Sequence, residues 1–219
     1  MTVLGIETSH EQGSLGLYHY GRVRGDVLFS TELGPGERLL PALESLLALN
    51  MVQREHLELI AVALGPGSFT SLRIGMAVGK GLAQALGIPI VGVPSMAAYA
   101  EKVSFLSGKI CVVLPDRRDL VYYALYEGTT QITPERSSTL QDLQEQLERI
   151  PDLAICIGPG AERHRAALER RATIAPSALN QPSGAVIAHL GAQKYSRSQH
   201  NELWTLEPLY VQPLLASVS

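Results

Sequence analysis

The feature that most constrains the fold is a strand-length apolar run that ends in Gly-Pro-Gly and occurs twice in the chain. Leu59–Leu64 runs into the first Gly-Pro-Gly at 65–67, and Leu153–Ile157 runs into the second at 158–160. Uninterrupted apolar runs of this length are typical of strands buried on both faces, and helical spacing follows each break. We therefore expect two copies of one α/β unit.

The segments around the two runs indicate the same order of elements in both halves, three strands followed by helix, strand and helix, and in the first half one more strand and one more helix follow. In the first half the expected strands are Thr2–Glu7, Gly13–Tyr20, Arg22–Thr31, Leu59–Leu64 and Ile88–Val93, and the expected helices span about 38–49, 70–86 and 95–103. The first helix is expected to start near Arg38, because Pro41 is tolerated only in a first turn.

The second half repeats this order more loosely. The expected strands are Lys109–Leu114, Leu120–Tyr126, Thr129–Thr133 and Leu153–Ile157, and the expected helices span about 139–149, 161–171 and 184–196, before an extended tail over 206–213. Thr139 and Asp142 have the spacing of a helix cap. Since Ser and Gly interrupt the pattern at 104–108, we expect two domains, residues 1–104 and 105–219.

The composition limits the class of protein. Over 219 residues the net charge is −3 and no run of Lys or Arg stands out. This composition does not favour a protein that binds nucleic acid without a partner. Cys111 and Cys156 lie inside apolar runs, so we expect buried free thiols, with a disulfide as the alternative. No apolar run reaches the ~18 residues of a membrane span, and we expect a cytoplasmic protein without a membrane segment.

The sequence offers no complete catalytic set. The six histidines have no pair at helical spacing, and neither Gly-x-Ser-x-Gly nor a P-loop motif occurs. We therefore expect no catalytic residue and no metal ligand. Ligands of such sheets bind in loops at the carboxyl ends of strands. The weak nucleotide-binding candidates in two such loops, each with a structural turn as the alternative, are Glu7, Thr8, Ser9, Gly65 and Gly67.

A third loop, Asp116–Asp119, mixes acidic and basic side chains between two expected strands. These charges could bind a carboxylate or phosphate group. A salt-bridged hairpin turn is the commoner explanation for such a loop.

The helix expected over 70–86 contains Gly75, Gly79 and Gly81, although glycine inside a helix costs about 0.5–1 kcal/mol relative to alanine. Small residues there indicate the close approach of another backbone, either the protein's own sheet or a helix of another subunit. On the second interpretation, Gly79→Leu weakens subunit pairing more than folding. The candidate partner-binding residues on this helix and on the Leu-rich helix before it are Leu39, Leu43, Phe69, Thr70, Arg73, Ile74, Met76, Ala77, Gly79 and Lys80.

The segment GPGSFTSLRIG at 65–75, together with 80–83 and 88–93, closely resembles the bacterial TsaB family, also called YeaZ. The segments 4–9, 37–41, 116–118 and 208–211 support the resemblance, which covers essentially the whole chain and is strongest over 59–94. The chain departs from the usual family pattern at four positions, Glu7, Pro35, Ser71 and Gln212.

The resemblance implies an α/β fold of the actin-like ATPase superfamily (ASKHA), with two RNase-H-like βββαβα halves. It also implies a non-catalytic partner in threonylcarbamoylation of the adenosine next to the anticodon of ANN-reading tRNAs. Helices of the N-terminal half would pair with a paralogue, TsaD, which carries the metal and the transfer chemistry.

Further partners follow from the same resemblance. An ATPase, TsaE, would join the assembly, a homodimer could form on a similar surface in the absence of TsaD, and tRNA would be met only through the complex. ATP or ADP could bind at a subunit junction. The alternative function is that of an ASKHA-type ATPase or small-molecule kinase, for which Thr8, Ser9 and the turn at 65–70 are the only support.

Overall fold

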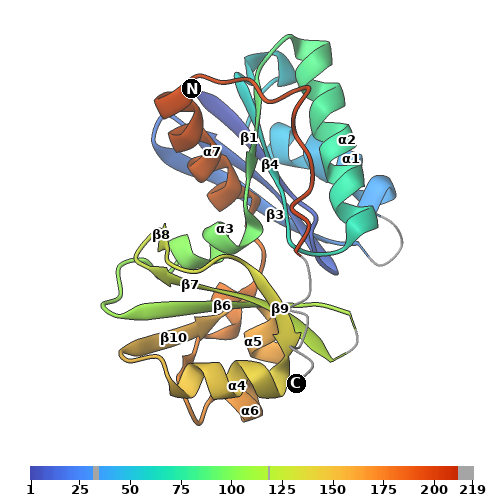
Figure 1. Ribbon diagram of the computed structural model, residues 1–219. Helices are drawn as coiled ribbons and strands as arrows, with labels where there is room; N and C mark the ends of the chain where they lie inside the picture. The colour runs from blue at the N-terminus through green and yellow to red at the C-terminus, as the bar shows by residue number, and fades with distance from the viewer. Residues whose placement is uncertain (32–34, 118, 212–219) are drawn as a thin grey trace. The chain divides into compact units, whose positions relative to one another are not determined.

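The computed structural model describes residues 1–31, 35–117 and 119–211, and it divides into two compact units (Figure 1). The first unit contains residues 1–98 and 182–209, and the second contains 99–181 with residues 210 and 211. The boundary between units falls inside helix α3 (Ser95–Glu101), and the chain returns to the first unit at Pro182. This differs from the expected domains 1–104 and 105–219, because the last helix belongs to the first unit.

The first unit is built on a five-stranded sheet with the order β3-β2-β1-β4-β5. β1 pairs antiparallel with β2 and parallel with β4, and every residue of β1 and β4 is buried. This agrees with the expected strands, whose bounds in the structure are β1 (Thr2–Glu7), β2 (Gln12–His19), β3 (Arg22–Ser30), β4 (Leu59–Ala63) and β5 (Ile90–Val93).

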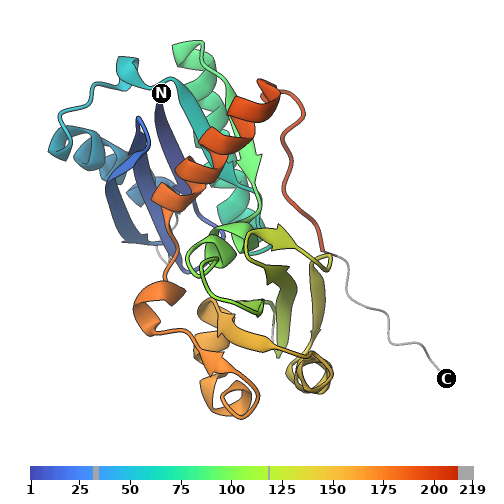
Figure 2. The same cartoon turned by 90° about the vertical axis from the view of Figure 1, so that its left-hand side faces the viewer.

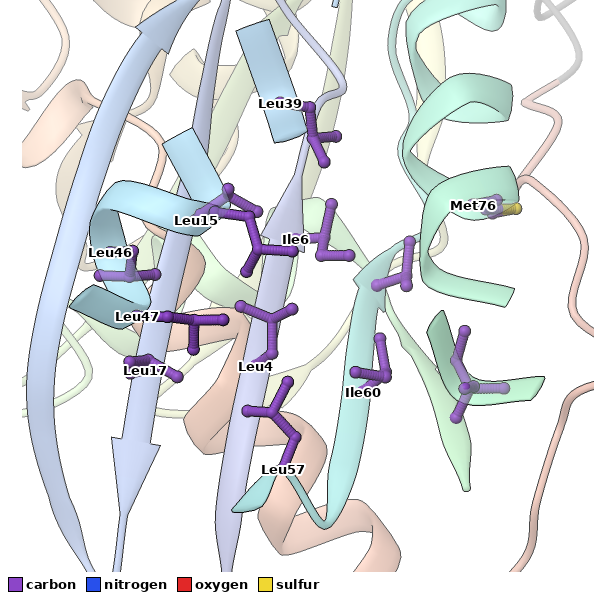
Figure 3. Packing of buried hydrophobic residues seen from close by; sticks show 14 of the residues in the cluster. Leu4, Ile6, Leu15, Leu17, Leu39, Leu46, Leu47, Leu57, Ile60 and Met76 are labelled. Carbon is purple, nitrogen blue, oxygen red and sulfur yellow. The ribbon is translucent and has the colours of Figure 1, made fainter. Parts of the chain in front are cut away.

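Helices cover both faces of this sheet. α1 (Pro35–Leu49) and α2 (Phe69–Leu86) pack on one face, and α7 (Gly184–Ser198), drawn in orange-red in Figure 2, crosses the strands on the other. Figure 3 shows leucines of α1 meeting side chains of β1, β2 and β4 in the core between α1, α2 and the sheet. The labelled members of this core include Leu4, Ile6, Leu15, Leu17, Leu46, Leu47, Ile60 and Met76.

The start of α1 corrects the sequence expectation. The helix begins at Pro35, so Pro41 is its seventh residue and not part of its first turn. Pro41 cannot donate the usual hydrogen bond to the carbonyl of Glu37. Glu37 and Pro41 both lie on the exposed side of the helix, where water can satisfy that carbonyl.

The second unit repeats the topology of the first. β6 pairs antiparallel with β7 and parallel with β10, which in turn pairs parallel with β11. The bounds are β6 (Lys109–Pro115), β7 (Leu120–Glu127), β8 (Thr130–Gln131), β9 (Arg136–Thr139), β10 (Leu153–Ile157) and β11 (Thr173–Ile174). The strand expected over 129–133 is only the two-residue β8, and β9, which the sequence did not indicate, also pairs with β7. The βββαβα duplication is confirmed.

The helices of the second unit are short. Thr139 caps α4 (Leu140–Glu148) by accepting a hydrogen bond from the amide of Asp142 at 3.1 Å, as expected. The helix expected over 161–171 is divided into α5 (Pro159–Arg163) and α6 (Arg165–Leu168). Between them His164 leaves helical geometry, with φ −107° and ψ 24°. Two short 3-10 helices, at 54–56 and 177–180, complete the described elements.

Cys111 of β6 and Cys156 of β10 lie side by side in parallel register, and both are buried free thiols. The sulfur of Cys156, to which Cys111 is hydrogen-bonded, and burial together raise the pKa of the Cys111 thiol well above its ordinary value. The expectation of buried free thiols is confirmed. Within the described ranges, none of the helices has the length and apolar character needed to cross a membrane.

The close packing of α7 on the sheet depends on glycines in β1 and β2, which have no side chain. A Cβ on Gly5 of β1 would lie 1.9 Å from the carbonyl oxygen of Gly184, and a Cβ on Gly16 of β2 would lie 1.9 Å from the amide nitrogen of Ala185. Asp26 of β3 accepts hydrogen bonds from the Ser183 hydroxyl at 2.5 Å and the Ala185 amide at 3.4 Å. The first turn of α7 therefore packs directly on the backbones of β1 and β2 and is hydrogen-bonded to β3.

Candidate functional site

The first two candidate loops lie against each other at the carboxyl ends of β1 and β4. The Ser9 carbonyl accepts a hydrogen bond from the Ser68 amide at 2.7 Å, and a Cβ on Gly67 would lie only 2.2 Å from the same carbonyl oxygen. The Ser95 hydroxyl donates to the Ser9 hydroxyl at 3.3 Å. The sequence therefore identified two loops that do meet, as parallel strand ends in such a sheet should.

The polar groups of these loops bind one another. The Thr8 hydroxyl donates to the Ser71 carbonyl at 2.8 Å, and the Ser9 amide donates to the Glu7 carboxylate at 2.6 Å. The Ser9 hydroxyl also lies 2.6 Å from Nδ1 of His10. Glu7, Thr8 and Ser9 are all buried.

An anion site at a strand-to-helix turn needs backbone amides directed at the ligand. Here the Ser68 amide donates to Ser9, and the Ser71 amide donates to the Ser68 hydroxyl that caps α2, at 3.4 Å. Both of these amides are therefore bonded within the protein in this conformation. The contacts of Thr8, Ser9 and Gly67 are those of a structural turn, and the weak nucleotide-binding assignment of Glu7, Thr8, Ser9, Gly65 and Gly67 stays a prediction.

The three glycines of α2 have different surroundings. A Cβ on Gly75 would lie 2.2 Å from the Thr8 hydroxyl oxygen, and one on Gly79 would lie 2.6 Å from Cγ2 of Val62. A Cβ on Gly81 would meet nothing within 4 Å. Gly75 and Gly79 therefore allow α2 to approach its own sheet, and the placement of Gly79 at a subunit contact is corrected.

The candidate partner-binding residues divide by burial. Leu39, Leu43 and Met76 belong to the core, with at most 5% of each side chain exposed. Ile74 and Lys80 are half-buried, and Nζ of Lys80 donates to the Leu206 carbonyl at 2.9 Å. Leu39, Leu43 and Met76 are therefore corrected to core residues, because they lie on the inner faces of α1 and α2.

The exposed candidates are Phe69, Thr70, Arg73 and Ala77. Together with Leu40, an exposed residue of α1 that was not a candidate, they make up what we call the α1–α2 face. Phe69 and Leu40 are each 49% exposed, and the guanidinium of Arg73 lies 3.9 Å from the centre of the Phe69 ring. The two helices adjoin at their N-terminal ends, where a Cβ on Gly36 would lie 3.9 Å from the Ile74 side chain. Leu40 is a residue that sequence reasoning missed, since the candidates on α1 were Leu39 and Leu43.

The third candidate loop is a closed turn. The Asp116 carboxylate accepts hydrogen bonds from the Arg117 amide and from the Ser137 hydroxyl, each at 2.6 Å. Burial, with a smaller effect of Asp116, raises the pKa of Tyr122 to about 12. Arg118 lies outside the described residues, as does Gln212.

In the described part of the chain, no three His, Cys, Asp or Glu side chains are grouped to hold a metal ion.

Comparisons with known proteins give a consistent result. Residues 36–181 match the family described as "TsaD: tRNA N6-adenosine threonylcarbamoyltransferase". The tRNA threonylcarbamoyladenosine biosynthesis protein TsaB of Bacillus subtilis is 29% identical over 208 residues, which cover 91% of each chain.

Solved structures agree with the sequence comparison. YeaZ from Pseudomonas aeruginosa superimposes with a TM-score of 0.76 at 25% identity, covering 96% of this chain and 99% of that one. A polyphosphate/ATP-glucomannokinase from an Arthrobacter strain shares the fold alone, with a TM-score of 0.54 at 12% identity, covering 88% and 99% of the two chains. The actin-like ATPase fold expected from the sequence is confirmed.

Proposed function

The chain belongs to the TsaD family, and within it to the TsaB (YeaZ) branch, and on that premise we propose that it is a non-catalytic partner of the transferase TsaD. The proposed role is to activate TsaD in forming threonylcarbamoyladenosine next to the anticodon of ANN-reading tRNAs. The TsaB names of its relatives place the family in threonylcarbamoyladenosine biosynthesis. The division of labour with TsaD and TsaE is part of the proposal.

The observation that carries the proposal is the α1–α2 face. It presents the half-exposed Phe69 ring, on which the guanidinium of Arg73 is stacked, and the half-exposed side chain of Leu40 on α1. Aromatic residues and arginine are enriched among the residues that dominate binding energy at protein interfaces. Beneath this face both helices are anchored in the core, α1 by its buried leucines and α2 by Met76 and Ala83.

The alternative, an ATPase or small-molecule kinase, depended on hydroxyls and amides at the ends of β1 and β4. Those groups donate to protein acceptors, as with Thr8 to Ser71 and Ser68 to Ser9. The same geometry supports a scaffold in preference to a phosphate-handling enzyme. Binding of ATP or ADP at a junction with a partner stays a prediction.

Reconstitution tests the proposal. The purified chain, TsaD and TsaE are mixed with tRNA and threonylcarbamoyl-adenylate, and modified nucleoside is measured by mass spectrometry. We expect modification only when this chain is present, and none from the chain by itself. Modification at full rate without the chain would reject the proposal.

A matched pair of variants tests the α1–α2 face. Phe69→Asp is expected to weaken pairing with TsaD at least tenfold, since truncating a central aromatic anchor typically costs about 2 kcal/mol or more. Phe105→Asp, at a 78% exposed aromatic of the second unit, is the control and should pair normally. Equal pairing of both variants would exclude Phe69 from the interface.

A further inference from the structure

A pocket of about 400 Å³ lies in the first unit, where the β2–β3 hairpin turn meets the last turns of α7. Its volume is within the range of small-molecule sites. It is lined on the hairpin side by Tyr18 and Tyr20 and on the helix side by Ala192, Gln193, Ser196 and Arg197. The small side chains of Ala192 and Ser196 leave the space that these tyrosines border.

Tyr20 stands at the rim in an unusual conformation. Its φ is +44°, a region where Gly and Asn are common and a bulky side chain is not. Its amide donates to the Met1 carbonyl at 3.2 Å, and its ring meets the His19 ring edge-on at 4.5 Å. Even so, 72% of Tyr20 is exposed. The turn therefore places the Tyr20 ring at the entrance of the pocket, where it is exposed to solvent.

A second aromatic ring and a cation complete the pocket. The Tyr18 ring packs on His189 at 5.0 Å, and His189 is fixed by a hydrogen bond with Gln193 at 2.8 Å. The exposed side chain of Arg197, in the last turn of α7, forms no hydrogen bond or ion pair with any other residue that the structure describes. The same is true of the side chain of Arg22, which follows the hairpin turn.

We propose that this pocket binds a nucleotide of an RNA strand, with the base stacked on the Tyr20 ring and the phosphate held by Arg197. Aromatic platforms beside cations are how proteins bind unpaired nucleotides. Arg22, next along the turn, would meet a neighbouring phosphate of the strand. The inference rests on the proposed function, which makes the strand that of the tRNA substrate.

Substitution at Tyr20 provides a sharp test because Asn suits its backbone. Tyr20→Asn removes the ring while relieving the unfavourable φ, so the fold should be kept. Binding of a fluorescent, unmodified tRNA transcript is measured for the complex with TsaD and for the chain by itself. We expect Tyr20→Asn to weaken binding roughly 5- to 150-fold, the range of one base–aromatic stack, and Tyr20→Phe to bind as the native chain does.

Arg197 gives an independent readout. The slope of log affinity against log salt is negative, and Arg197→Gln should make it less steep by about one, the effect of one lost phosphate contact. The control is Arg149→Gln, at an exposed arginine of the second unit, which should leave the slope unchanged.

Three results would overturn or separate the claims. Unchanged tRNA affinity in Tyr20→Asn and an unchanged salt slope in Arg197→Gln would overturn the RNA site. Binding of AMP that Tyr20→Asn abolishes, with tRNA affinity unchanged, would assign the pocket to a free nucleotide and also overturn it. Failure to pair with TsaD would refute the proposed function. In that case transcript binding by the chain by itself that Tyr20→Asn weakens would still support the pocket, and no binding by the chain would overturn it.

Discussion

Two glycines of one helix give a direct test of how α2 packs. Gly79 and Gly81 lie two residues apart, yet a Cβ on Gly79 would lie 2.6 Å from Cγ2 of Val62 and 3.3 Å from Cδ1 of Ile90, whereas one on Gly81 would meet nothing within 4 Å. We compare Gly79→Ala with Gly81→Ala. The same atom is added to the same helix in both variants, and only its surroundings differ.

The magnitude follows from two opposing effects. Both variants gain the helix propensity of alanine over glycine, about 0.5–1 kcal/mol, and Gly81→Ala should be stabilised by that amount. Gly79→Ala also overpacks the core, which costs about 1–3 kcal/mol, because Val62 is a buried, β-branched residue with little rotamer freedom. Since the propensity gain cancels in the comparison, Gly79→Ala should be less stable than Gly81→Ala by about 1–3 kcal/mol.

Urea unfolding followed by far-UV circular dichroism measures this difference, provided that the two m-values agree. Equal stability of the two variants would refute the packing of α2 on β4 and β5. The larger Gly79→Leu should collapse the fold rather than merely weaken pairing, which reverses the expectation drawn from the sequence.

Two further predictions concern single side chains in the two units. Asp26→Ala should lower the unfolding free energy by about 1–2 kcal/mol, because Ser183 and the Ala185 amide at the start of α7 lose an acceptor; a urea midpoint equal to that of the native chain would contradict this. The guanidinium of Arg165 holds the pKa of Glu162 below its ordinary value of 4.5. The ionised carboxylate therefore stabilises the fold fully above pH 4.5. This contribution is lost as the pH falls through the lower pKa of the folded state. The effect is small since 35% of Glu162 is exposed. Glu162→Gln should be less stable than the native chain at pH 7, and this difference should shrink as the pH falls below 4.5; a stability difference independent of pH would disprove it.

Most of the fold could be predicted because its signals are local. The apolar run at 59–64, the Gly-Pro-Gly break and the Thr139 cap each specify their own element, and the duplication follows from their repetition. The destination of α7 could not be predicted, because its own pattern fits any sheet. Its contacts with Gly5 and Gly16 depend on residues almost 180 positions earlier in the chain.

The candidate site was predicted less well for a related reason. Helical spacing shows that leucines share a face, but it does not distinguish Leu39, which is buried, from Leu40, which is half exposed. Small residues in α2 signal close approach without naming the neighbour, which for Gly79 is Val62. The pocket beside Tyr20 gave one faint signal, an aromatic residue next to a turn glycine, Gly21.

The route of the chain affects how the protein can be made. One face of the first sheet, with Val3, Ala61 and Val91, is covered by α7 from the far end of the sequence. During synthesis this apolar face of the sheet therefore stays exposed until residues 184–198 have been made. A fragment ending near residue 98 would keep it bare permanently, so the N-terminal half is a poor candidate for expression as a separate domain.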